Sequence, residues 1–307
     1  MTAQAPVWEL ARDEPGFPAQ LLDLGKDAPE SLFGCGGEEL VRELALDRCV
    51  TIVGSRRASS YGLRVAEELG QLLAAAGLVI VSGMARGIDA AAHRGALAGG
   101  GPTIAVLGGG PDVVYPVGER RLYREILRAG AVISEASPGR RPEAWSFPVR
   151  NRIMAALAAM TVVVEAAQPS GSLITARQTL DLGRELGAVP GPVNSRVSEG
   201  TNDLIVDGAA PIRGAQDVLD RLLGVGEPHA RRRGPALEPG LTRVAELVER
   251  GNASCDAVAT AAAIPPADAA VALARLELLG YVRVDADGRY ARTTLRPPGD
   301  EAPRADD

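Results

Sequence analysis

The chain of 307 residues has few aromatic side chains for its length and almost no lysine. Aromatic residues make up only 3% of the sequence, whereas hydrophobic residues as a whole make up 46%. The core must therefore be built from alanine, valine, leucine and isoleucine, which suits parallel strands covered by small-residue helices. The length predicts one α/β domain with a smaller companion.

Cysteines and long apolar runs are also scarce. Cys35, Cys49 and Cys255 lie far apart and show no CxxC or Cys/His spacing, which argues against a disulfide framework and a zinc site. We expect no metal and no cofactor. The N-terminus lacks a basic and apolar signal sequence, and no apolar run reaches the roughly 18 residues of a membrane span. We expect a cytoplasmic protein with no membrane partner.

Positive charge comes almost entirely from arginine, because Lys26 is the only lysine. The formal net charge of −6 argues against a protein that is basic throughout. Arginine is nevertheless the better residue for planar, paired contacts with phosphate. Any anion site should therefore be a local cluster of arginines.

Turn signals and periodicity divide the chain into five parts. Residues 1–47 form a lead-in of short helical turns, and residues 225–240 form a polar linker. Residues 48–224 alternate strands with helices, which predicts a Rossmann-like, mainly parallel sheet with helices on both faces. Residues 241–293 predict three helices and a hairpin, as in a winged-helix domain, and residues 294–307 a disordered tail.

The expected elements of the Rossmann-like part follow one another at short intervals. Strands are expected at 49–53, 78–81, 103–107, 131–134, 161–165 and 188–189, and helices at 60–76, 88–98, 119–129, 148–159 and 172–186. In the small domain we expect helices at 241–250, 254–262 and 267–279, and a hairpin turn at 285–288. Ligands of such sheets bind beyond the carboxyl ends of the strands.

Three strands end in loops of small residues that lead into helices. Each junction leaves unpaired backbone N–H groups at a helix N-terminus, where anions bind readily. Glycine permits a close approach of the backbone to a ligand, and serine can cap the helix. The residues predicted to hold an anion with several phosphates here are Gly54, Ser55, Arg56, Gly83, Arg86, Ser170, Gly171 and Ser172.

A fourth candidate segment runs from Phe147 to Arg152. Pro148 fits the first position of a helix, so Arg150, Asn151 and Arg152 would lie in its opening turn. Two arginines there oppose the helix dipole, and an anion held between them would relieve this arrangement. The alternative is that an acidic side chain pairs with them; the candidates are Glu135, Glu143 and Glu165.

The aromatic residues near this segment allow two interpretations each. Phe147 and Trp145 could stack on a nucleobase. Equally, Phe147 could anchor the helix in the core, and for Trp145 we favour that structural role. His93 continues a helix, and we assign it no chemistry.

Taken together and in this order, the segments resemble the DprA (Smf) family of DNA-processing proteins. The resemblance covers about residues 17–213. The matching words are Val53–Arg56, Ser82–His93, Phe147–Ile153, Val164–Ala166, Ser170–Ala176, Val189–Gly191 and Gly200–Ala209. The family also carries, in some members, a lysine three residues before the motif phenylalanine, and here that position is Ala144.

The resemblance implies a recombination mediator and not an enzyme. Such proteins bind single-stranded DNA taken up in natural transformation, protect it and load the RecA recombinase onto it. The DNA would lie over Arg56, Arg86 and the turn from Arg150 to Arg152. The family dimerises through a surface that overlaps the RecA contact, which here corresponds to Asn202 through Pro211, with Leu204 and Ile205 as apolar contacts.

An enzymatic alternative is a nucleotide phosphoribohydrolase of the lysine decarboxylase-like family. Pro169–Ser172 aligns with the glycine loop of those enzymes, but Leu173–Gln178 lacks the acid that should follow. A dinucleotide oxidoreductase fits less well, because no GxGxxG follows the first strand. We expect a preference for single-stranded over duplex DNA, weakened by Arg56→Ala or Arg152→Ala. For the winged helix we favour interaction or regulation, since Arg275 is the only basic residue in its third helix.

Overall fold

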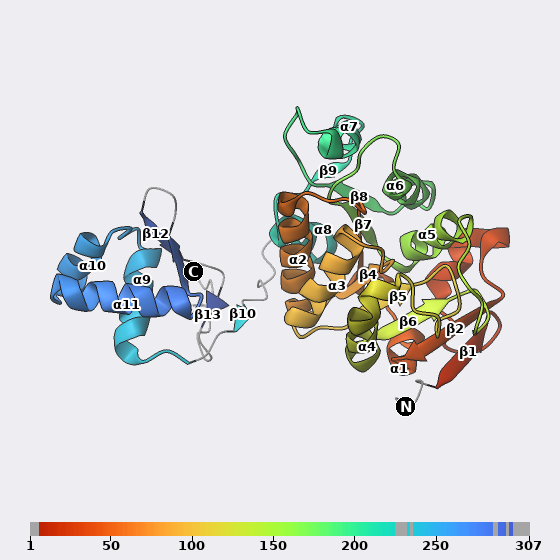
Figure 1. The fold of residues 1–307 in the computed structure, drawn as a ribbon, viewed down its shortest axis with the longest axis horizontal. Helices are drawn as coiled ribbons and strands as arrows, with labels where there is room; N and C mark the ends of the chain where they lie inside the picture. Colours follow the sequence, from red (N-terminus) through yellow and green to blue (C-terminus); the bar gives the residue numbers. More distant parts are fainter. Residues whose placement is uncertain (1–5, 225–231, 234–235, 285–287, 293–294, 297–307) are drawn as a thin grey trace. The chain divides into compact units, whose positions relative to one another are not determined.

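A nine-stranded sheet organises the first part of the computed structural model, which describes residues 6–224, 232–233, 236–284, 288–292 and 295–296 (Figure 1). The strand order is β1-β2-β6-β5-β4-β3-β7-β8-β9. Neighbouring strands from β6 to β9 are parallel, and β2 pairs antiparallel with both β1 and β6. The strands are β1 (Val7–Ala11), β2 (Ser31–Gly36), β3 (Cys49–Val53), β4 (Val79–Ser82), β5 (Thr103–Val106), β6 (Ala131–Ser134), β7 (Met160–Val163), β8 (Glu185–Ala188) and β9 (Ala210–Pro211).

The chain changes direction across the sheet at β3. It runs outward from β3 through β4 and β5 to β6, and then returns to place β7 on the other side of β3. At such a switch point the loops beyond neighbouring strands diverge and leave a crevice where ligands bind. The loops that follow β3 and β7 meet at this point.

Helices cover both faces of the sheet, which confirms the predicted Rossmann-like α/β fold (Figure 1). Apolar residues alternate along the strands, so that Cys49 and Val53 belong to one core cluster while Val50 and Ile52 belong to another. One face packs on α2 (Ser60–Ala75), α3 (Ile88–Ala98), α4 (Arg120–Ala129) and α8 (Ala215–Leu223). The other packs on η1 (Ala19–Asp27), α1 (Glu38–Arg42), α5 (Ser146–Leu157), α6 (Gly171–Asp181) and α7 (Glu199–Val206).

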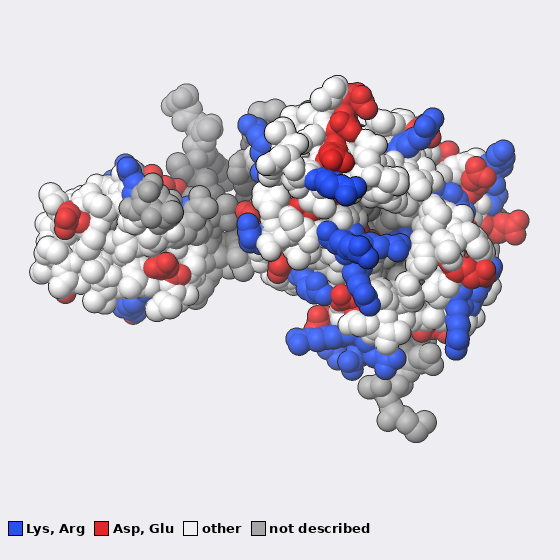
Figure 2. All heavy atoms as spheres, turned by 45° about the horizontal axis from the view of Figure 1, so that its top comes forward, with Lys and Arg blue, Asp and Glu red and all other residues white. Residues whose placement is uncertain are grey.

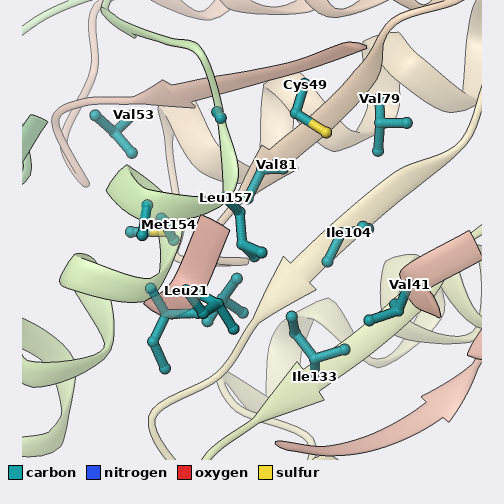
Figure 3. Packing of buried hydrophobic residues seen from close by; sticks show 14 of the residues in the cluster. Leu21, Val41, Cys49, Val53, Val79, Val81, Ile104, Ile133, Met154 and Leu157 are labelled. Atoms are coloured by element: carbon teal, nitrogen blue, oxygen red, sulfur yellow. The ribbon is translucent and has the colours of Figure 1, made fainter. Parts of the chain in front are cut away.

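Helix α5 is fixed by the core beneath it. Met154 and Leu157 point toward the strand side chains Val81 and Ile104, with Leu21 of η1 alongside (Figure 3). All five side chains are buried. Because this contact holds the helix rigidly, the polar residues at its start are presented at a defined place above the sheet.

Helices α2 and α3 approach each other to backbone contact. A Cβ atom added at Gly70 would lie 2.3 Å from the Ala92 carbonyl oxygen, and one added at Gly95 would lie 2.0 Å from the Glu67 carbonyl oxygen. Any larger residue would force the helices apart. The glycines therefore set the position of the loop that precedes α3.

The lead-in of residues 1–47 differs from the prediction, because it contributes β1 and β2 to the main sheet. The turn-rich sequence hides these strands. Gly34 lies in β2, and a Cβ atom there would come within 2.1 Å of the Trp8 ring, so this glycine makes room for the tryptophan. The Trp8 indole N–H also donates to the Gly36 carbonyl at 2.7 Å. The boundary predicted after residue 47 therefore does not separate the lead-in from the sheet.

Several element boundaries in the Rossmann-like part also differ from the prediction, those of α5 and α6 among them. Helix α6 ends at Asp181 and not at residue 186, because Gly183 adopts a positive φ of 66° and turns the chain into β8. Helix α5 begins at Ser146 and not at Pro148. As a result, Arg150 is the fifth residue of the helix and lies beyond its opening turn.

The chain divides into two compact units, residues 1–230 and 231–307, and the second is built as a winged helix. Its helices α9 (Pro239–Glu249), α10 (Cys255–Ala262) and α11 (Pro266–Leu278) enclose a core of Leu241, Val244, Leu273, Leu276 and Tyr281. Strands β11 (Val282–Val284) and β12 (Tyr290–Arg292) pair antiparallel, as predicted for the hairpin. Most of the predicted turn, residues 285–287, lies outside the described residues.

A short parallel pair joins the predicted linker to the predicted tail. Strand β10 (Arg232–Arg233) pairs with β13 (Leu295–Arg296), so the two segments are not structureless throughout. The remainder of the predicted tail, residues 297–307, lies outside the described residues. Across the described parts of the chain, no single helix combines the length and apolarity needed to span a membrane; α10 and α11 meet that test only together, across a bend of 112°.

His93 in α3 is completely buried and serves the packing of the sheet. The Thr103 hydroxyl donates to the Ile80 carbonyl at 2.6 Å, so it accepts its second hydrogen bond from Nδ1–H of His93 at 2.7 Å. Burial lowers the pKa of His93 to about 3, and nearby Arg150 and Arg94 add to the shift. Because this pKa lies far below neutral pH, the histidine is uncharged in the folded protein at that pH.

We predict that His93 makes folding stability fall in acid. The unfolded chain takes up a proton near pH 6.5, which the folded chain resists down to about pH 3. Stability from this residue is thus present above pH 6.5 and is lost as the pH falls, by up to about 1.4 kcal/mol per pH unit. Urea unfolding over a pH series should show a shallower loss in His93→Asn, which keeps an amide donor for Thr103. Parallel curves for the two proteins would refute this role.

Candidate functional site

Two adjoining cavities open beyond the carboxyl ends of the central strands. The larger, of about 780 Å³, is lined by the loops after β3 and β7 and by the start of α6; we call it the cradle. The smaller, of about 500 Å³, is lined by the loops after β4 and β5; we call it the side cavity. Both include Arg56, Arg57, Ala85, Phe147 and Arg150 in their walls. The two cavities therefore share one border.

The loop after β3 is fastened to its neighbours by backbone contacts. Ser55 donates its N–H to the Glu165 carbonyl at 2.7 Å and accepts the Ile88 N–H on its own carbonyl at 3.2 Å. A Cβ atom at Gly54 would lie 2.7 Å from the Ile88 side chain, so glycine is needed here for close packing. This fixed backbone sends the side chains of Arg56 and Arg57 outward, and both are exposed.

Arg150 is buried beneath the two cavities and is only 4% exposed. Its Nη1 donates to the Gly83 carbonyl at 2.7 Å and also to the Val106 carbonyl. Its Nη2 lies 3.8 Å from the Asp89 carboxylate. A Cβ atom at Gly83 would lie 2.1 Å from this guanidinium, so Gly83 leaves space for the arginine and not for a ligand.

The charges of Arg150 and Asp89 depend on each other. Burial lowers the pKa of Arg150 to about 10, which still leaves it charged at neutral pH, and Asp89 opposes the shift. Burial likewise raises the pKa of the Asp89 carboxyl, while Arg150 and the Ala85 N–H act against that rise. The pair is thus a structural ion pair that ties α3 to α5 and to the ends of two strands.

Asn151 and the serines of the loop after β7 form one hydrogen-bonded group. The Asn151 amide donates to the Gly171 carbonyl at 3.2 Å and accepts from Arg150 Nε at 3.2 Å. The Ser170 hydroxyl accepts the Ser172 N–H at 3.3 Å, which caps α6. The start of this helix, which is the positive end of its dipole, therefore faces the cradle. The sequence predicts such an arrangement for an anion site.

Arg152 lies on the opposite side of α5 from Arg150. Its guanidinium makes two hydrogen bonds to the Glu135 carboxylate, at 2.8 and 2.6 Å, and a third to the Asp27 carbonyl at 2.8 Å. It lines neither cavity. The alternative left open by the sequence, pairing with an acidic side chain, therefore holds for Arg152, and no anion can lie between Arg150 and Arg152.

Glu165 and Glu143, the other two acids considered as partners, are engaged elsewhere. The Glu165 carboxylate accepts hydrogen bonds from the N–H and hydroxyl of Ser59 at the start of α2. Glu143 accepts the indole N–H of Trp145 at 2.8 Å and lies 3.8 Å from Arg140. Neither acid neutralises the arginines at the border of the two cavities.

Four exposed arginines gather around the cavities without acidic partners. Within the described residues no carboxylate lies within ion-pairing distance of Arg56, Arg57, Arg86 or Arg196, which are exposed. Figure 2 shows arginine side chains clustered beside a hollow on this unit. Such a local field attracts anions even though the whole chain carries a net charge of −6.

Phe147 is half-buried at the border between the cavities. The Arg56 guanidinium lies 5.1 Å from the centre of its ring, and the Tyr115 ring lies 5.3 Å away at an angle of 34°. Trp145 is 50% exposed, so the structural role that we favoured for it is wrong. Its ring carries the guanidinium of Arg140 at 5.3 Å.

The residues predicted for dimerisation lie on α7 and β9. The Asn202 amide bonds to both the N–H and the carbonyl of Gly191, at 3.2 and 3.1 Å, and so holds a loop of its own chain. Leu204 and Ile205 are half-buried against the core. Val206, which follows them, is 85% exposed, and Pro211 is exposed on the edge strand β9. Among these apolar residues of α7, Val206 therefore exposes the largest fraction of its surface, whereas Leu204 and Ile205 are half-buried.

Sequence reasoning missed Arg57, Arg196 and Tyr115 as cavity residues. The Arg56-Arg57 doublet directly after the glycine loop was a usable signal, because both residues follow a strand end. Arg196 and Tyr115 lie outside the recognised motifs, and only the fold brings them to the cavities. Among the described residues, no group of three or more His, Cys, Asp or Glu side chains could hold a metal ion.

Comparison with known proteins identifies the family. The model of the DNA recombination-mediator protein A family matches residues 9–223. The chain belongs to this family. The DNA processing protein DprA of Streptococcus pneumoniae is 44% identical over 193 residues, which cover 63% of this chain and 67% of that protein. A Mycobacterium tuberculosis relative that also carries the DprA name is 39% identical over 249 residues, or 79% of this chain.

Solved structures of the family share the fold of this chain. The S. pneumoniae DprA structure has a TM-score of 0.65 at 40% identity and covers 70% of this chain and 74% of its own. The DNA processing protein A of Helicobacter pylori, described for its single-stranded DNA binding mode, has a TM-score of 0.63 at 31% identity, with 73% of this chain and 98% of its own covered. This chain spans 64% of the length of the mycobacterial relative.

We predict that Arg150 supports the fold of the site. Arg150→Met would leave the Asp89 carboxylate buried without its partner and should lower the free energy of unfolding by about 3–5 kcal/mol. The double variant Asp89→Asn, Arg150→Met should recover part of the loss, since no buried charge remains. Urea unfolding midpoints with unchanged slopes measure both effects. A loss below about 1 kcal/mol in the single variant would contradict the structural role.

Proposed function

We propose that the chain binds single-stranded DNA in the cradle and acts, as a homodimer in the cytoplasm, to protect the strand and load RecA onto it. The observation that carries this proposal is the set of exposed, unpaired arginines around the two adjoining cavities: Arg56 and Arg57 at their shared border, Arg196 in the cradle and Arg86 in the side cavity. The H. pylori relative, described for its single-stranded DNA binding mode, supports the choice of ligand. Faster RecA filament assembly on a strand bound by this protein is the expected readout of loading.

The proposed contacts divide the predicted site residues into two groups. Arg56 and Arg86 contact phosphates directly, and the start of α6 at Ser170, Gly171 and Ser172 receives a further phosphate. Arg150, Asn151, Gly54 and Gly83 shape the cradle from below. Arg152 is left out of the DNA contacts because Glu135 and Asp27 hold it.

The acidic residues of the site favour binding of a nucleic acid or nucleotide over its hydrolysis. Among the described residues that line the two cavities, Asp89 is the only carboxylate. It is 5% exposed and is engaged by Arg150 and by the Ala85 N–H at 3.4 Å. A general base must reach its substrate, and Asp89 faces the interior instead. We therefore propose a non-enzymatic role.

We predict that Arg56→Ala weakens binding to a labelled single-stranded oligonucleotide by about 1–3 kcal/mol, because a charge-assisted contact to phosphate is lost. The slope of log affinity against log salt should fall by about 0.7, the value for one phosphate on a single strand. Fluorescence anisotropy over a salt series measures both quantities, with duplex DNA as the weaker ligand.

The matched control is Arg121→Ala, which removes the same charge from an exposed arginine of α4 paired with Glu125. Its affinity should equal that of the wild type. Arg152→Ala should lower stability and leave the affinity unchanged. Equal binding of single-stranded and duplex DNA, or no loss in Arg56→Ala, would refute the cradle as the binding site.

For the dimer we predict an interface that includes Val206. This side chain is 85% exposed at the end of α7, so Val206→Glu should leave the fold intact and bury a charge in the interface. Sedimentation equilibrium should change from the mass of two chains to the mass of one. Val271→Glu, at a 61% exposed valine of α11, is the control. A Val206→Glu protein that remains dimeric would exclude this surface.

A further inference from the structure

Helix α4 carries a row of arginines along its outer face. Arg120, Arg124 and Arg128 follow one another at intervals of four residues, so they lie on one side of the helix with a rise of about 6 Å between neighbours. All three are exposed, whereas Leu122 and Ile126 on the other side of the helix are buried. We call the three arginines the α4 row. Figure 2 shows basic side chains gathered at the lower edge of the Rossmann-like unit, apart from those beside the hollow.

The acidic residues of this segment do not neutralise the α4 row. Residues 119–129 contain two carboxylates, and each already has a partner: Glu119 lies 2.6 Å from Arg94, and Glu125 lies 2.8 Å from Arg121. In the described ranges of the chain, no carboxylate lies within ion-pairing distance of the row. Three guanidinium groups therefore keep their full charge at the surface.

The α4 row is unfavourable for the helix when nothing is bound to it. Like charges four residues apart on a helix repel each other and destabilise it. The Nε of Arg124 donates to the Arg120 carbonyl at 3.4 Å, which holds its guanidinium close to the turn that carries the first arginine. Arg120 also lies at the positive end of the helix dipole, where a negative charge is preferred. An anion bound along the row relieves both repulsions.

A phosphate backbone fits this surface better than an acidic protein does. Apart from arginines, the outer surface of α4 offers only Ala129 and the half-buried Glu125 and Leu127. Stable protein interfaces have an apolar centre from which charged residues are depleted, and α4 has no such centre. Contacts between arginine and phosphate need no apolar surface. The row spans about 12 Å, so its repeated charges match a repeated anion better than a single one.

The α4 row begins beside the side cavity. Gly118 lines that cavity, and Arg120 follows two residues later, at a Cα separation of no more than about 7 Å. Helix α4 leads from the loop after β5 to the start of β6, which is parallel to β5. It therefore runs from the carboxyl edge of the sheet toward its amino edge. The row continues from the cavities along the flank of the sheet.

We propose that the α4 row holds the phosphate backbone of a single strand where the strand leaves the two cavities. This proposal rests on the proposed function and adds a contact outside both cavities. It gives the strand a path past Gly118 and along the outer face of α4. A duplex segment beside the bound strand has the same phosphate chemistry, and the experiment distinguishes the two.

The test compares the wild type with the triple variant Arg120→Gln, Arg124→Gln, Arg128→Gln over thymidine oligonucleotides of increasing length. The two proteins should bind the shortest oligonucleotides, which occupy only the cavities, with nearly equal affinity. Once the oligonucleotide is long enough to reach α4, the variant should bind about 3- to 150-fold more weakly, the range for three exposed ion pairs. The slope of log affinity against log salt should then fall by about 2, since each phosphate on a single strand contributes about 0.7.

Folding of the triple variant is checked by its urea midpoint. Glutamine is close to arginine in helix propensity, and the substitutions remove a repulsion without changing the buried side of α4. The midpoint should therefore not fall. Equal affinity for the shortest oligonucleotides provides a second check, because it requires intact cavities.

The matched control is the triple variant Arg64→Gln, Arg213→Gln, Arg221→Gln. It removes three exposed arginines from α2, from the turn before α8 and from α8, and so changes the net charge by the same amount. None of these arginines lines either cavity. The affinity of this control should follow that of the wild type at every length.

The outcomes separate this contact from the proposed function. A loss that is the same at every length, an equal loss in the control, or no loss at all would overturn the contact along α4 and leave strand binding in the cradle standing. Absence of strand binding by the wild type at any length would refute the proposed function itself.

A second arm joins the shortest bound oligonucleotide to either a single-stranded or a duplex extension. Weaker binding of the row variant to the single-stranded extension supports the proposed path. If the loss is confined to the duplex extension, the α4 row contacts duplex DNA and the assignment to a single strand is wrong.

Discussion

The buried guanidinium of Arg150 holds together the part of the molecule on which the site depends. It joins the carbonyl groups of Gly83 and Val106, at the ends of β4 and β5, to the carboxylate of Asp89 at the start of α3. A charge in a dry interior is tolerated only when it is paired and hydrogen-bonded on all sides. Because these contacts are internal, the loops keep one arrangement before any ligand arrives.

Because Arg150 fixes the loops from inside the protein, the arginines near the site serve two purposes. Arg150 and Arg152 form ion pairs within the protein, with Asp89 and Glu135 respectively. Arg56, Arg57 and Arg86 are exposed and have no acidic partner among the described residues. The net charge of −6 is then no obstacle to binding an anion, because binding depends on the local electrostatic field near the cavities. Aromatic residues are just as unevenly used: few in number, yet Phe147 and Tyr115 meet at the border of the two cavities.

The alternation of strands and helices could be predicted from the sequence because each element carries its own period and its own end signal. Segments whose structure depends on distant partners could not. Strand β2 contains Gly34, which suggests a loop until Trp8 of β1 is seen to occupy the space above it. The end of α6 was missed for a local reason, since Gly183 turns the chain three residues before residue 186, where we expected the helix to end.

The site shows the same division between local and distant causes. Residues two apart on a helix are turned by about 200° from each other, so Arg150 and Arg152 cannot reach one anion. The spacing of two residues between Arg150 and Arg152 was therefore sufficient to exclude an anion held between them. Which arginine faces inward could not be predicted, because Gly83 comes from the β4 loop and Glu135 from the end of β6, and only the folded sheet brings each to its own side of α5.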